Sequence, residues 1–598
     1  MAYRPSATVG SALRTILPRG TNLEVYKPEG VDDHDERYLW QKPPYFAPDL
    51  FAATAYLCKV GGVVSYFNPS PYGGADEASE FFINREDRDA ANKAANEWRA
   101  PANNLRFPDL CRSLWDNVFD AWEESLNPGA YDHVGGKAPA WWSAALRLVM
   151  ISDMACARIM RNKLVKYDTD GVEIEQPEEP FEIAVKTKYN FAKQRASDKG
   201  KEFRSPASLT YMVDESVACV LPKMRVAPVG ATLRNVSRNL SLLPGKGEVR
   251  CLWSNMASNA IPNEDHETLD VLLIPEPRKL NSLDFEAEDN EDRPNGELRR
   301  NKWAWDNFEL KQNWIDSSDK RSDFVADCIQ LLRKAKEQSA CVNAVVLPEY
   351  AIDYDMFERL CTALKTVEPG LEFVISGSSS NCEGQKGNIV VTRVWDDRRA
   401  PEFYITDSRR KHHRWRMNRS QVETYALSAA LNPKIENWWE KTPLGRRELF
   451  FHRFRKASVF SVLICEELAR SDPCHEILRS VAPNLIFALL LDGPQIRNRW
   501  PAQYASNLAD DPGSSVLTFT SYGLIERSNQ QGHFEPNHSI AMWKDDSGKI
   551  VEIPMPQGDG PRGVLLSLWP EHVRDITITG KRSEERAWRY ASHFPIVL

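Results

Sequence analysis

Three side chains that could take part in catalysis each follow a short apolar run in the second half of the chain. Glu349 follows the sequence VVLP at 345–348, and Cys465 follows SVFSVLI at 458–464. Lys411 comes after FYIT and the polar step DSRR. A carboxylate can remove a thiol proton, a thiolate can attack an acyl carbon, and an ammonium can stabilise the oxyanion that forms. These residue types therefore fit hydrolysis through a covalent cysteine intermediate.

The elements that must position these residues read as alternating strands and helices. Apolar runs predict strands at 271–274, 343–347, 372–375, 389–394, 458–464, 485–491 and 516–520, with a helix at 322–338 and further strands up to residue 568. Alternation of this kind is typical of a layered α/β fold. Because ligand-facing groups collect at the carboxyl ends of strands in such folds, we expect the three side chains to share one site.

Each residue alone also has a simpler interpretation. A cysteine at a strand end is commonly a small buried hydrophobic residue, and a glutamate after proline is commonly a solvated loop residue. Lys411 lies in the run RRKHHRWRMNR at 409–419, where six of eleven residues are Lys or Arg. Such a run fits a solvated basic face as well as a binding surface. The spacing leaves these alternatives open.

The motifs taken together resemble the nitrilase, or carbon–nitrogen hydrolase, superfamily. The segment CVNAVVLPEY at 341–350 is similar to its first motif, and YITDSRRKHHR at 404–414 to its lysine motif. The segment 457–491, an apolar strand, a cysteine, a helix and another apolar strand, is similar to its nucleophile motif. The resemblance covers about 269–598 and includes the three motifs in the family's order.

The resemblance implies a role for each site residue. Glu349 would be the general base, Lys411 the catalytic lysine and Cys465 the nucleophile that forms a thioester. The backbone N–H of Glu466 would help Lys411 to bind the oxyanion, although the negative side chain of Glu466 should raise the pKa of the thiol. Many members carry a second glutamate that orients the substrate, and Glu423 is the predicted one. The segment 426–447 is interpreted as an inserted excursion.

The resemblance also implies an architecture and a substrate class. We expect residues 263–598 to form a four-layer α-β-β-α sandwich that assembles into a homo-oligomer and acts on an amide or a nitrile without a metal or organic cofactor. The basic residues around Lys411 predict either a pocket rim that attracts an anionic substrate or a subunit contact. These residues are Arg409, Arg410, Arg414, Arg416 and Arg419.

The first 262 residues contain no chemical motif and show no family resemblance. Tryptophans and helical periodicity predict a domain over 1–262 that is mainly helical or mixed α+β, with its clearest helix at 141–166. We expect this domain to regulate or position the second one.

Composition excludes several classes of protein. A net charge of −8 argues against a nucleic-acid footprint over the whole surface, and 42% hydrophobic residues exclude a disordered chain. No apolar stretch is long enough to cross a bilayer, no signal peptide is visible, and the eleven cysteines lack a CxxC pair, so we expect a cytoplasmic protein. Two other functions stay open: a catalytically silent sensor in a regulatory or antiviral-defence system, and nucleic-acid binding through 409–419, which the negative net charge disfavours.

Overall fold

The computed structural model divides the chain into two compact units, each described here by itself. Unit 1 comprises Met1–Asn259, Ile477–Ala482 and Val573–Glu585, and unit 2 comprises Ala260–Glu476, Pro483–His572 and Arg586–Leu598. The structure describes residues 7–21, 36–72, 81–101, 106–126, 138–157, 159, 166–167, 173–174, 179–198, 205–254, 267–288, 305–395, 403–455, 457–532, 535–558 and 560–598.

Unit 1 is built around a buried helix, α5 (Ala140–Ala155), against which α2, α3 and α4 pack. Its Trp141 and Trp142 are almost fully buried. The helix ends at Ala155, earlier than the predicted 141–166; residues 158 and 160–165 lie outside the described part. The other elements of unit 1 are α1 (Val9–Ile16), η1 (Glu36–Trp40), α2 (Ala47–Val60), η2 (Val63–Tyr66), α3 (Arg85–Arg99), α4 (Asp109–Asp120), β1 (Lys166–Tyr167), β2 (Glu173–Ile174), α6 (Pro180–Asp198), β3 (Ala218–Pro222), α7 (Leu233–Val236), β4 (Leu240–Pro244) and β5 (Arg250–Ser254).

The first large sheet of unit 2 has the strand order β12-β11-β10-β9-β6-β21-β22. The central strands β6, β9 and β10 are parallel, and the neighbouring pairs β10–β11, β11–β12 and β6–β21 are antiparallel. Strand β12 therefore runs in the same direction as β9, and the two end at the same edge. The strands are β6 (Leu269–Leu273), β9 (Ala344–Val346), β10 (Phe373–Ser380), β11 (Lys386–Trp395), β12 (Tyr404–Arg410), β21 (Arg562–Ile576) and β22 (Arg582–Val597).

The second large sheet contains β20-β19-β18-β17-β16-β15 in that order. Its central strands β16, β17 and β18 are parallel to one another, as in the first sheet. The outer pairs β15–β16, β18–β19 and β19–β20 are antiparallel. The strands are β15 (Glu448–Arg455), β16 (Ser458–Ile464), β17 (Leu485–Leu490), β18 (Ser515–Thr520), β19 (Ser539–Lys544) and β20 (Ile550–Pro554).

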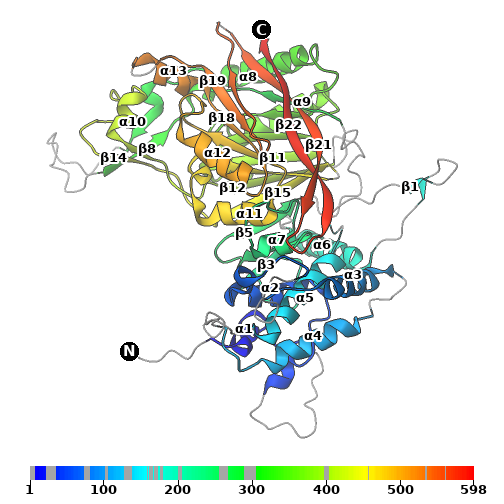
Figure 1. Ribbon diagram of the computed structural model, residues 1–598. Coiled ribbons are helices and arrows are strands. Elements are labelled where there is room, and N and C mark those ends of the chain that lie inside the picture. The colour runs from blue at the N-terminus through cyan, green and yellow to red at the C-terminus, as the bar shows by residue number, and fades with distance from the viewer. Residues whose placement is uncertain are drawn as a thin grey trace. The chain divides into compact units, whose positions relative to one another are not determined.

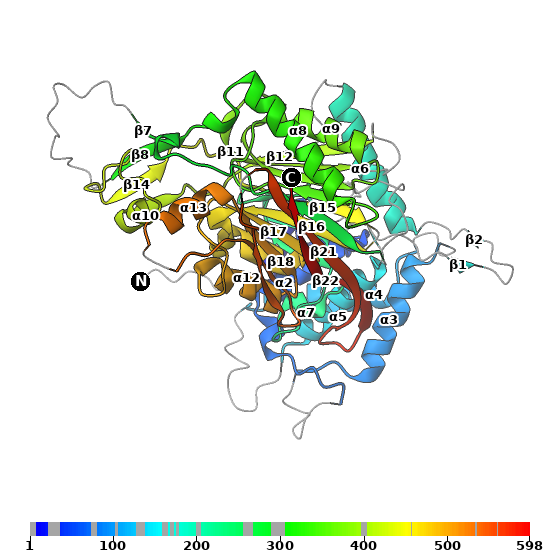
Figure 2. The same ribbon diagram turned by 90° about the horizontal axis from the view of Figure 1, so that it is seen from above.

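The two sheets pack face to face and are covered by helices on their outer faces (Figures 1 and 2). Successive residues of β6 point to opposite faces of the first sheet. Val271 lies in the core between the two sheets, whereas Leu272 packs under α8 (Ser318–Ala335) and α9 (Tyr354–Val367). Helix α12 (Trp500–Asp510) covers β18 and β19. Burial on both faces explains why these strands are continuous apolar runs. The predicted α/β class is confirmed.

A small sheet with the order β13-β14-β8-β7 extends unit 2 and has its own apolar core. Its strands are β13 (Arg416–Asn418), β14 (Asn437–Glu440), β8 (Trp305–Leu310) and β7 (Phe285–Ala287), and α10 (Arg419–Thr424) follows β13. The segment 426–447, interpreted from sequence as an inserted excursion, thus contributes a paired strand. Across the described residues of both units, no helix has the length and apolarity needed to cross a membrane.

The remaining elements of unit 2 are short, apart from α13, and connect the strands. They are η5 (Ser282–Asp284), η6 (Asn313–Ile315), η7 (Cys465–Leu468), η8 (Ser471–His475) and α13 (Tyr522–Gln530). Helix α11 (Glu476–Val481) spans the boundary at which the chain is divided into units.

Candidate active site

Glu349 lies just beyond the carboxyl end of β9, and its side chain is buried. The neighbouring strand β10 approaches this turn closely, since the N–H of Gly377 donates a 3.0 Å hydrogen bond to Pro348 O. A Cβ atom at position 377 would lie 2.4 Å from the Glu349 Cα, so only glycine allows this approach. Backbone packing therefore fixes the position of the carboxylate.

Lys411 follows β12 at the same edge of the sheet, and its side chain is almost completely buried. Its Nζ donates to Glu349 Oε1 at 3.0 Å and to Glu440 Oε2 at 2.9 Å. The Asn388 Nδ2 donates to Glu349 Oε1 at 2.6 Å and to Glu440 Oε1 at 2.8 Å. The lysine and the asparagine thus connect two carboxylates in one buried network.

Glu440 is a member of this network that the sequence analysis missed. It ends β14, and its Oε2 also accepts the backbone N–H of Trp415 at 2.9 Å. Glu423, the predicted second glutamate, lies on α10 instead, where it is half exposed and pairs with Arg419 at 2.9 Å. The structure therefore does not bring Glu423 to the network and places Glu440 against Lys411.

The charges of the network favour an ammonium at Lys411. Burial lowers the pKa of Lys411, but Glu349 and Glu440 outweigh that effect and hold the pKa well above its usual range. For Glu349, burial raises the pKa, and the nearby ammonium only partly opposes the rise. Among the described residues, Glu349 Oε2 has no hydrogen-bond partner. One oxygen of this carboxylate is held and the other is available to accept a proton.

Cys465 lies at a sharp turn between β16 and the short helix η7. Its φ of 45° is in the left-handed region, which costs energy for a residue with a side chain and is concentrated at functional sites. The charges of both Glu349 and Lys411 act on its thiol. The structure therefore brings together the three side chains predicted to be catalytic.

A buried ion pair fixes the turn that carries the thiol. Glu467 accepts hydrogen bonds from Arg409 of β12 at 2.9 and 2.6 Å and from the N–H groups of Ile464 at 2.9 Å and His412 at 2.8 Å. Burial would raise the pKa of Glu467, but Arg409 and these hydrogen bonds hold it at about 2. This pair joins the lysine-bearing strand to the turn at Cys465.

One group of side chains has the composition of a metal site. Ligand atoms of His412, Glu467 and Cys474 lie within 4.8 Å of one another and are buried. Both oxygens of Glu467, however, already accept hydrogen bonds from the Arg409 guanidinium, which supplies the positive charge there. The chemistry of these donors fits an ion pair rather than a bound cation.

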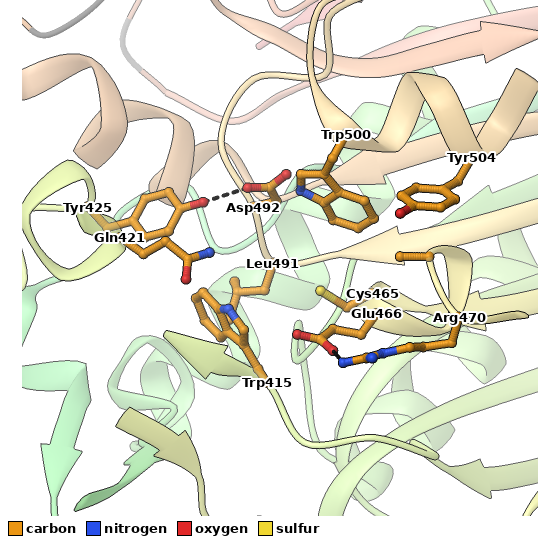
Figure 3. Close-up of a pocket in the computed structure, with 11 residues that line it drawn as sticks. Trp415, Gln421, Tyr425, Cys465, Glu466, Arg470, Leu491, Asp492, Trp500 and Tyr504 are labelled. Carbon is orange, nitrogen blue, oxygen red and sulfur yellow. Dashed lines mark hydrogen bonds and ion pairs between the residues drawn. The ribbon is translucent and has the colours of Figure 1, made fainter. Parts of the chain in front are cut away.

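A cavity of about 270 Å³ opens beside Cys465 (Figure 3). The Cys465 sulfur points into the space between Trp415 and Trp500. Arg470 at the rim pairs with the Glu466 side chain at 3.1 Å. The Glu466 N–H, in the first turn of η7, stays a predicted oxyanion donor. The lining residues are Trp415, Gln421, Tyr425, Cys465, Glu466, Ala469, Arg470, Leu491, Asp492, Trp500 and Tyr504.

The basic run 409–419 does not form a continuous basic surface. Arg409, Lys411, His412 and Trp415 are buried, and the exposed arginines alternate with them. None of the run's arginines is among the residues that line the cavity beside Cys465. The structure thus divides the run between the interior and the solvent.

The resting state of Cys465 can be tested by alkylation. Burial raises the pKa of the thiol well above its usual value; Glu349 raises it further, while Lys411 opposes the rise. We expect the rate of iodoacetamide labelling of Cys465 to keep increasing with pH on the alkaline side of neutrality, because the reactive thiolate is scarce. Peptide mass spectrometry would measure this rate, with the exposed Cys382 as an internal reference. A plateau near neutral pH would contradict a raised pKa.

Comparison with known proteins gives matches in structure. No protein-family model and no curated protein matches the chain. Glutamine-dependent NAD⁺ synthetase from Acinetobacter baumannii aligns with 50% of this chain at 12% identity and a TM-score of 0.29. The alignment spans only 45% of that synthetase.

Two shorter proteins align over most of their own length. Nit3 from Saccharomyces cerevisiae, a member of branch 10 of the nitrilase superfamily, aligns with 51% of this chain and 91% of its own at 12% identity and a TM-score of 0.29. An amidase from Nesterenkonia sp. aligns with 51% and 94% at 11% identity and a TM-score of 0.27. About half of this chain is similar in structure to solved members of the nitrilase superfamily.

Proposed function

We propose that unit 2 is a nitrilase-like four-layer α-β-β-α sandwich and that the protein hydrolyses a non-peptide carbon–nitrogen bond, in an amide or a nitrile, through a thioester on Cys465. The observation that carries this proposal is the buried network of Glu349, Lys411 and Glu440 next to a cysteine on a left-handed turn that faces a cavity. The nucleophile lines the cavity, and a base and a cation lie in the buried network beside it; these are the groups that acyl transfer requires.

The first half of the reaction follows from the charges. The free Oε2 of Glu349 accepts the thiol proton as sulfur attacks the substrate carbon. The Lys411 ammonium and the N–H of Glu466 stabilise the oxyanion, and one such donor is typically worth about 3 kcal/mol. With an amide, Glu349 then gives its proton to the departing ammonia or amine, which leaves a thioester on Cys465. A nitrile would first form a thioimidate on Cys465, which takes up one water and loses ammonia to give the same thioester.

The second half restores the enzyme. A water molecule gives a proton to Glu349 as its oxygen attacks the thioester carbon, and the acid is released as Cys465 regains its proton. Glu440 acts as a positioning residue, because it accepts a second hydrogen bond from Lys411 Nζ beside the one to Glu349. With Glu440 in place, the ammonium is kept charged and at a fixed position for the oxyanion.

Intact-mass spectrometry after exposure of the protein to a mixed library of amides and nitriles tests the proposal. We expect a stoichiometric mass increase equal to an acyl group, located at Cys465 by peptide mapping and lost on prolonged incubation as the thioester hydrolyses. If no compound gives an adduct or a product, the interpretation as a silent sensor replaces the hydrolase.

A further inference from the structure

The walls of the cavity beside Cys465 are largely aromatic. Trp415 and Tyr425 lie on one side and Trp500 and Tyr504 on the other (Figure 3). Its volume of about 270 Å³ is near the lower end of the range for small-molecule pockets, roughly 300–1,000 Å³. The space therefore suits a short acyl group enclosed by ring faces.

Asp492 contributes a buried carboxylate to this wall. It follows β17 of the second sheet and is 4% exposed. Its Oδ1 accepts the Tyr425 hydroxyl at 2.5 Å and Arg499 Nη2 at 2.7 Å. Its Oδ2 is buried and has no hydrogen-bond partner among the described residues. An unpaired buried carboxylate oxygen is costly, and a ligand that donates a hydrogen bond to it would remove that cost.

The charges around the site have a negative surplus. Among the described residues, the carboxylates of Asp492 and Glu466 line the cavity, and those of Glu349 and Glu440 belong to the buried network beside the thiol. Their cationic partners are three: Lys411, Arg499 and Arg470. In a partly desolvated cavity this imbalance disfavours a substrate with a second negative charge and favours a positive one. Ring faces add a favourable interaction with a cation.

We infer that the acyl part of the substrate carries a protonated amine, which Asp492 Oδ2 binds between the aromatic rings. This inference rests on the proposed hydrolase function. It differs from the anionic substrate that was one of the two alternatives for the basic run; the arginines of that run are not among the residues that line the cavity. Tyr425 and Arg499 act as positioning residues that hold the carboxylate through its other oxygen.

The test compares primary amides of matched chain length in three forms, ending in an ammonium, a methyl or a carboxylate group. At each of several lengths, kcat/KM is measured for the wild-type protein. We expect the best ammonium amide to exceed its methyl counterpart by at least about tenfold, and the carboxylate amide to be the poorest. A methyl or carboxylate amide as the best substrate at every length would overturn the inference.

Asp492→Asn tests the carboxylate itself. The substitution keeps an oxygen that can accept from Tyr425 and Arg499 but presents an uncharged donor in place of Oδ2. We expect the ammonium-to-methyl ratio of kcat/KM to fall at least about tenfold, mainly through KM. Asp472→Asn, which removes an exposed carboxylate paired with Arg447, is the matched control and should leave the ratio unchanged.

The outcomes separate the two proposals. Turnover of methyl amides with an adduct on Cys465, but no preference for the ammonium form, would overturn the inference and leave the hydrolase function standing. A ratio that Asp492→Asn does not change would overturn the role of Asp492. If Asp492→Asn does not fold, the wild-type series decides alone. No turnover of any form would overturn both proposals.

Discussion

Replacement of Cys465 by alanine should abolish amide hydrolysis while leaving the protein folded. Loss of a covalent nucleophile typically lowers kcat by about 10⁴-fold or more. Alanine is smaller than cysteine and has the same backbone preferences at the left-handed φ of 45°, so the free energy of unfolding should change by only about 1 kcal/mol. Product release from the best amide substrate and urea unfolding measure the two effects.

A second cysteine supplies the control for this experiment. Cys382 is exposed and lies on the turn between β10 and β11, and Cys382→Ala should retain both hydrolysis and the acyl adduct. If Cys465→Ala kept more than about a hundredth of the wild-type rate, or if the adduct formed on another residue, a nucleophilic role for Cys465 would be excluded.

Replacement of Lys411 by methionine should affect both activity and stability. The variant leaves Glu349 and Glu440 buried without their shared cation, and removal of one partner from a buried ion pair typically costs about 3–5 kcal/mol. Hydrolysis should fall by about 10³-fold, because an oxyanion donor is lost. The loss of stability should become smaller as pH falls, since burial raises the pKa of Glu349 and its carboxyl can then fold with its proton bound.

A double variant separates the two roles of the lysine. Lys411→Met combined with Glu440→Gln removes one of the stranded charges, so part of the lost free energy of unfolding should return. Hydrolysis should not return, because the ammonium is still missing. Equal stability of wild-type protein and Lys411→Met in urea unfolding would show that the buried network does not stabilise the fold.

Much of unit 2 could be predicted because its strands are apolar on both faces. The strand predicted at 458–464 coincides with β16, and those at 485–491 and 516–520 differ from β17 and β18 by one residue at one end. Doubly buried strands give strong, local signals. The chemically capable residues at their ends, such as Cys465, were therefore visible in the sequence.

Glu440 and the small sheet were missed for the opposite reason. Strand β14 has four residues and pairs in parallel with β8, which lies more than a hundred positions earlier in the chain. No local sequence pattern predicts the pairing of two short strands that are so far apart in the chain. A weak signal exists in hindsight: Trp438 and Glu440 are two residues apart and both buried, as expected for side chains on one face of a strand. Glu423 is closer to Lys411 in sequence, so the family pattern of a glutamate shortly after the lysine predicts it instead.

The three predicted catalytic side chains come from two sheets that face each other. Glu349 and Lys411 follow strands of the first sheet, and Cys465 follows a strand of the second. Between the sheets, the ring centroid of Phe373 lies 4.6 Å from that of Phe460 and 5.9 Å from that of Phe487. These rings belong to the apolar core that fills the space between the two sheets. A substitution that changes the size of these core side chains would change the distance between the sheets. The distance between Cys465 and its two partners would then change while all three catalytic side chains are kept.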